Sequence, residues 1–228
     1  MDSVLVENAG KVVLKGSDYL VAPEESRMEF VLTYAGPLVT DGVRPKDKHT
    51  IRRYFHPQLK RLWDTHQALM HAQHGTIVDA PQIDPKTSLR EGLAQRFQSQ
   101  NHSWVPLVRS ELALHCCLDF LILRPEPPGE VNRSGDLDNR VGVLVDALSL
   151  PNRSVGHAAL GDPPTADEKP FFVLLEDDRC VTRIVVETST LLERVNPVAT
   201  KDEARVVVKV TLTPQYLTGV NFHFLGHR

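Results

Sequence analysis

The stretch from Glu111 to Leu123 constrains the fold more than any other part of the chain. Every second position in it is apolar: Leu112, Leu114, Cys116, Leu118, Phe120 and Ile122. The positions between them are also largely apolar, and they include Ala113, Cys117, Leu121 and Leu123. A strand that is apolar on both faces is typical of a sheet interior. We therefore expect a β-sheet with this strand at its centre.

Other segments supply partners for this strand. Residues 28–34 and 205–213 alternate apolar and polar side chains, and the short segments 171–175 and 181–187 are also strand candidates. Helical spacing of apolar residues begins at Phe55 and continues towards Gly75, and it recurs at 137–148. Ser88 and Glu91 have the spacing of a capping box for one further short helix. This order predicts an α+β fold, a mixed β-sheet with helices packed on one side.

The 228 residues, of which 41% are hydrophobic, suit one globular domain with additions. We expect an N-terminal extension at 1–27, a main domain at 28–213 and a C-terminal tail at 214–228. Polar segments at about 75–103 and 151–170 have the composition of insertions. Apolar runs are too short to span a membrane, and the N-terminus does not have the pattern of a secretion signal. We therefore expect a cytoplasmic protein without a membrane partner.

Charge is distributed unevenly along the chain. Between Arg44 and Arg61 the local balance is +6, which leaves −9 for the remainder of a chain with a net charge of −3. A face that binds a phosphate backbone requires this kind of segregation, although a solvated helix face would give the same pattern. The candidate nucleic-acid-binding residues of this segment are Arg44, Lys46, Lys48, Arg52, Arg53, Lys60 and Arg61.

Two acidic segments are the strongest functional signal. Asp136 and Asp138 are separated by one residue at the start of the helical segment 137–148, and Glu176, Asp177 and Asp178 follow a predicted strand. Carboxylates repel one another, so a site that gathers several of them usually holds a cation, and oxygen ligands suit Mg²⁺ or Mn²⁺. Alternatively, Asp138 caps the helix and the second acidic run forms a turn.

Taken together, these motifs resemble the RusA-like family of Holliday junction resolvases, the crossover junction endodeoxyribonucleases. The resemblance consists of a strand, then Asp-Leu-Asp-Asn at 136–139 opening a helix, Asp-Ala-Leu at 146–148 closing it, and Asp177-Asp178 followed by Val181. It spans most of residues 28–213. The resemblance implies a RusA-like fold and a homodimeric, Mg²⁺-dependent endonuclease that hydrolyses phosphodiesters at branched DNA.

Carried over position by position, the resemblance implies that Asp136, Asp138 and Asp178 bind the metal. Asp146 would be a structural or catalytic acid at the end of the helix. Arg140 and Arg179 join the candidate residues for contact with branched or duplex DNA.

One position departs from the family pattern. Where the resemblance expects a lysine one turn after Asp138, this chain has Gly142. The sequence therefore leaves three functions open. The chain could be an active nuclease, a catalytically weak or inactive relative that binds nucleic acid or a protein, or a structural domain whose aspartates cap a helix and shape a turn.

Overall fold

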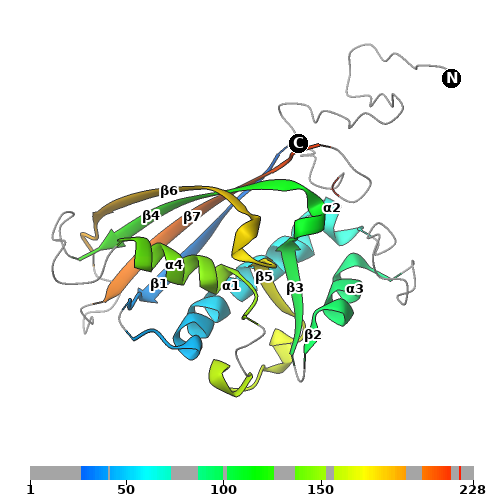
Figure 1. Cartoon of the computed structure of the whole chain (residues 1–228), viewed down its shortest axis with the longest axis horizontal. Helices are drawn as coiled ribbons and strands as arrows, with labels where there is room; N and C mark the ends of the chain where they lie inside the picture. Colours follow the sequence, from blue (N-terminus) through cyan, green and yellow to red (C-terminus); the bar gives the residue numbers. More distant parts are fainter. Residues whose placement is uncertain are drawn as a thin grey trace, which may run out of the picture.

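In the described part of the chain, the larger of two sheets contains four strands in the order β1–β7–β4–β6 (Figure 1). The computed structural model describes residues 27–40, 42–72, 87–99, 102–125, 137–152, 157–193, 202–216 and 221. The strands are β1 (Met28–Pro37), β4 (Leu114–Arg124), β6 (Val181–Thr190) and β7 (Glu203–Pro214). β7 is antiparallel to both β1 and β4, whereas β6 runs parallel to β4. The sheet is therefore mixed, and β4 lies in its interior as predicted.

The two faces of this sheet differ in their surroundings. Leu118, Phe120 and Ile122 of β4 are buried on the inner face, against the helices, together with alternate valines of β7. On the outer face, the alternate residues of β4 between His115 and Leu123 are half-buried or exposed. Figure 1 shows helices on only one side of the sheet. The prediction of an α+β fold with a mixed sheet is confirmed, and β4 is buried on its inner face only.

The second sheet was not predicted. It contains β2 (Gln98–Ser99), β3 (His102–Val108) and β5 (Phe171–Leu175), and β3 is parallel to β5. Pro106 lies inside β3 opposite Val173. Because proline is usually excluded from strand interiors, this segment has a poor sequence signal for a strand.

The long helix α1 (Pro45–Thr65) begins ten residues before the predicted start at Phe55. Pro45 occupies its first turn, and Asp47 accepts hydrogen bonds from the backbone N–H and the guanidinium of Arg44. The basic segment from Arg44 to Arg61 therefore lies on α1, with Arg44 as its N-cap. The chain becomes extended at His66, after which α2 (Gln67–Met70) follows.

The other helices follow the sequence closely. Ser88 and Glu91 form the predicted capping box of α3 (Leu89–Arg96). Helix α4 (Leu137–Leu148) packs its buried stripe beneath the four-stranded sheet (Figure 1). Short 3₁₀ turns cover 110–112, 157–160, 166–168 and 178–180.

Several predicted segments lie largely outside the described residues, including the N-terminal extension and much of the segment at 75–103. In the predicted C-terminal tail, Asn221 is fully buried, and its amide donates to the carbonyls of Leu112 and Tyr216. This residue is therefore anchored to the main domain. No helix in the described part of the chain has the length and apolarity needed to cross a membrane.

Candidate active site

An open cavity of about 1030 Å³ lies where the ends of α4, β3 and β5 meet the start of β4 and β6. Among the described residues, four carboxylates line it: Asp146, Glu176, Asp177 and Asp178. Arg109 and Arg179 are the guanidinium groups in the same wall. The cavity thus brings together the acid at the end of α4 and the acidic turn after β5.

Backbone hydrogen bonds hold the acid-bearing segments together. Ser149, just beyond α4, forms an isolated parallel bridge with Leu175, and the N–H of Leu150 donates to the Leu175 carbonyl at 3.0 Å. On the other side, the N–H of Glu176 donates to the carbonyl of Val108 at 2.9 Å. Since β3 and β5 are parallel, their carboxyl ends meet at one edge. Main-chain pairing therefore sets the position of the acids.

Two of the four acids are held by local partners. Glu176 accepts hydrogen bonds from the backbone N–H and the hydroxyl of Ser110, at 3.2 and 3.4 Å. Asp177 accepts from the guanidinium and the backbone N–H of Arg179, and these bonds lower the pKa of Asp177 to about 2. Both carboxylates therefore shape the turn that carries the exposed Asp178.

Asp146 is positioned by α1. The ammonium of Lys48 forms an ion pair with its carboxylate. The guanidinium of Arg52, which is only 3% exposed, donates to the carbonyls of Asp146 and Ser149 at 2.7 and 2.9 Å. These carbonyls lie at the C-terminal end of α4, where a helix lacks its usual N–H donors, and Arg52 donates a hydrogen bond to each. Two basic residues of α1 thus fix the acid at the cavity.

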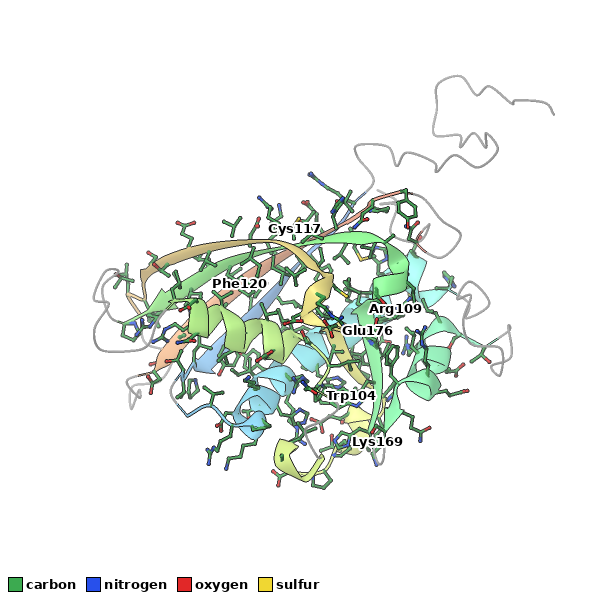
Figure 2. All side chains as sticks on the ribbon, in the orientation of Figure 1. Trp104, Arg109, Cys117, Phe120, Lys169 and Glu176 are labelled. Atoms are coloured by element: carbon green, nitrogen blue, oxygen red, sulfur yellow. The ribbon has the colours of Figure 1, made fainter. Side chains whose placement is uncertain are left out.

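Arg109 forms part of the cavity wall although it is almost fully buried. Its guanidinium donates to Glu111 at 2.9 Å and to the carbonyl of Pro106 at 3.1 Å. Figure 2 shows Arg109 close to Glu176, near the turn after β5. The fixed positive charge beside the acids partly offsets their mutual repulsion.

The structure does not bring the two described metal-ligand candidates, Asp138 and Asp178, together at the cavity. Asp136 lies outside the described residues. Asp138 is exposed in the first turn of α4 and is not among the residues that line the cavity. It precedes Asp146 by eight positions, which corresponds to about 12 Å along the helix axis. Among the described residues, no three His, Cys, Asp or Glu side chains form a group that could hold a metal ion.

The predicted nucleic-acid-binding residues divide into two groups. Arg52 and Arg140 are buried, and Arg140 donates to the carbonyl of Leu38 at 3.0 Å. The others are exposed or half-buried. Of these, Arg44 pairs with Asp47, Arg53 with Glu168 and Arg179 with Asp177. The outward-facing cations of the segment include Lys46 and Arg61.

Sequence reasoning missed two features of the cavity. It did not identify Arg109 and Ser110 as wall residues, although both follow an apolar segment that ends at Val108. It also assigned Lys48 to DNA contact alone, because no local pattern links a lysine in α1 to an acid in α4.

Comparisons of this chain with family models, with curated proteins and with solved structures found no match. The RusA-like resemblance therefore rests on the motifs in the sequence.

Proposed function

We propose that this chain is a Mg²⁺-dependent, structure-selective endonuclease that hydrolyses phosphodiesters at branched DNA, in the manner of RusA-like resolvases. The observation that carries the proposal is that Asp146 and Asp178 line the same cavity. Asp146 belongs to the Asp-Ala-Leu motif at 146–148, and Asp178 belongs to the Asp177-Asp178 motif. The segregated charge of α1 supports a DNA substrate.

The chemistry of the donors suits a hard cation. Carboxylate oxygens are preferred ligands of Mg²⁺ and Mn²⁺. Asp178 offers an exposed carboxylate at the cavity, and Asp136 and Asp138 are the further donors that the motif implies. When bound, the metal would activate a water for attack on phosphorus and stabilise charge on the leaving oxygen.

Lys48 supplies a positive charge beside Asp146, a residue of the cavity lining. Its ammonium pairs with Asp146, which lies one helical turn after Gly142 on the same side of α4. We propose that Lys48 contributes the charge that a lysine at position 142 would otherwise bring. A fixed cation beside the scissile phosphate would stabilise its developing negative charge.

The test uses a labelled four-way junction incubated with Mg²⁺. We expect wild-type protein to cut it, and Asp178→Asn and Asp146→Asn to lower the rate about a hundredfold or more. Asp162→Asn is the matched control, because Asp162 is an exposed acid outside the cavity lining. No cleavage by wild type, or full activity of the Asp178 and Asp146 variants, would refute the nuclease proposal.

A second candidate function is that of a resolvase-like protein that binds branched DNA without cutting it. It is favoured by Gly142, where an added Cβ would meet no atom within 4 Å, and by the exclusion of Asp138 from the cavity lining. The first feature leaves open space where a catalytic lysine would stand, and the second separates a predicted metal ligand from the other acids. Salt-dependent binding of the junction without turnover in Mg²⁺ or Mn²⁺ would support this candidate.

A further inference from the structure

The cavity has a large uncharged part in addition to its acids. Among the described residues, the charged lining consists of Asp146, Arg109, Arg179 and the acidic turn at 176–178. Much of the remaining wall comes from the ends of α3, β4 and β7, with Phe97, Ala113, Leu114, Gln215 and Tyr216. The volume of about 1030 Å³ is at the upper end of the range for pockets that hold small molecules. The cavity therefore has room for a substrate group beside the acids.

Tyr216 is the half-buried aromatic residue of this uncharged part. Main-chain hydrogen bonds fix its position just beyond β7. The N–H of Gln215 donates to the carbonyl of Ala113 at 2.9 Å, and the amide of the buried Asn221 donates to the carbonyl of Tyr216 at 2.7 Å. The backbone that carries the ring is thus tied to the start of β4 and held at the cavity.

The sheet sets the spacing between Tyr216 and the acidic turn. Strands β6 and β7 lie on either side of β4, and β6 begins at the edge where β7 ends, because β6 is parallel and β7 antiparallel to β4. Neighbouring strands are about 4.8 Å apart. The segments that carry Asp178 and Tyr216 therefore reach the cavity about 10 Å apart across the sheet. This spacing is close to the length of one nucleotide.

Charge determines which part of a nucleic acid can enter the uncharged part of the cavity. Among the described lining residues, four carboxylates outnumber two guanidinium groups, so a phosphate that no cation bridges is repelled. A nucleobase is neutral and planar, and an aromatic ring such as that of Tyr216 can stack on any base. The amide of Gln215, next in the chain, can donate to and accept from a base edge.

We infer that one unstacked nucleotide of the DNA enters this cavity, with its base against the ring of Tyr216 and its phosphate on the side of Asp178. The substrate class is then branched DNA that carries unpaired nucleotides at the branch, because an unpaired base costs least to remove from the stack. This inference rests on the proposed function, since it takes the bound polymer to be DNA.

Binding measured in Ca²⁺ tests the inference without requiring cleavage. The probes are two four-way junctions, one fully paired and one with unpaired nucleotides at the branch, the latter with 2-aminopurine at an unpaired position. We expect wild type to bind the unpaired junction about fivefold or more tightly than the paired one, and stacking on Tyr216 to quench the fluorescence of 2-aminopurine.

Two substitutions of Tyr216 separate stacking from a structural role. Tyr216→Leu keeps an apolar side chain but removes the ring, so the preference and the quenching should both be lost while affinity for the paired junction is unchanged. Tyr216→Phe is the matched control and should retain both, because the ring remains. Circular dichroism verifies that each variant is folded.

Cleavage of the same junctions in Mg²⁺ distinguishes the two proposals. If neither junction is cut but quenching that depends on Tyr216 persists, the nuclease proposal fails and the base site stands. If wild type shows neither preference nor quenching, or if Tyr216→Leu retains both, the base site is overturned, whatever the outcome for cleavage.

Discussion

His49 and Arg52 lie one turn apart on α1 and are both buried. The guanidinium of Arg52 contacts Nδ1 of His49 at 3.3 Å. Because a guanidinium can only donate, this nitrogen must be an acceptor, which requires a neutral imidazole. Burial, reinforced by the charges of Arg52 and Arg53, lowers the pKa of His49 to about 3. The ring therefore stays neutral at physiological pH.

This neutral histidine gives folding a defined pH dependence. Below about pH 6.5 the unfolded chain protonates His49, whereas the folded chain does not until about pH 3. Acidification across this window therefore lowers the free energy of unfolding, by up to about 1.4 kcal/mol per pH unit from this residue. We expect His49→Gln to reduce the slope of the free energy of unfolding against pH, by up to the contribution of one bound proton.

Urea unfolding at about pH 7, 6 and 5 measures this slope. His115→Gln, at an exposed histidine on β4, is the matched substitution for comparison. A slope that is identical in wild type and His49→Gln would show that His49 is protonated in the folded protein.

The buried arginines show a limit of sequence reasoning at this scale. Arg52 and Arg140 were predicted to contact DNA, and both are at most 3% exposed. Their partners are the carbonyls of Asp146, Ser149 and Leu38, on segments distant in sequence. Counting charges along the chain does not reveal such partners, because a backbone carbonyl has no sequence signature.

At the scale of elements, α4 contains an unusual glycine. Gly142 is exposed in the middle of the helix, and a Cβ added there would meet no atom within 4 Å. Glycine inside a helix is less favourable than alanine by about 1 kcal/mol. We expect Gly142→Ala to raise the free energy of unfolding by about that amount and the Tm by about 2–4 °C.

A thermal melt followed by circular dichroism measures this gain. Gly161→Ala provides the opposite case. Gly161 has a φ of +97°, which residues with a side chain rarely adopt, so this substitution should lower the Tm. A Tm that falls with Gly142→Ala would indicate that α4 is constrained on its exposed side.

Elements with strong local patterns were predicted well, and those defined by distant partners were not. The capping box of α3, the apolar stripe of α4 and the alternation of β7 are encoded within each segment. By contrast, β3 contains Pro106 and becomes a strand through pairing with β5. The start of α1 depends on Pro45 and Asp47, which the apolar periodicity used for prediction does not detect.

At the scale of the whole molecule, opposite charges are separated. The chain has a net charge of −3, the carboxylates gather at the cavity, and cations gather on α1. The sequence grouped Asp178 with Asp136 and Asp138, whereas the structure places Asp178 at the cavity with Asp146. The pairing of Asp146 with Lys48 was not predicted, because it depends on how α1 packs against α4. Sequence thus identified the acids, whereas packing determined their partners.

If α1 holds the DNA backbone, binding must depend on salt. Removing a side chain that neutralises one phosphate should reduce the slope of log K against log salt concentration by about one. We expect Lys46→Ala and Arg61→Ala to weaken junction binding and each to reduce this slope, as measured by fluorescence anisotropy across a salt series.

Lys209→Ala serves as the control, because Lys209 lies on the exposed outer face of the sheet, away from the helices. Equal effects of all three substitutions would indicate that binding does not use α1 specifically.

The bridge between Ser149 and Leu175 has a consequence for how this site can change over time. Since main-chain bonds join the segments that carry Asp146 and Asp178, neither carboxylate is needed to hold the cavity walls in place. An acid at either position can be lost, gained or replaced while the scaffold persists. The scaffold of the cavity is therefore separable from the carboxylates on which the proposed activity depends.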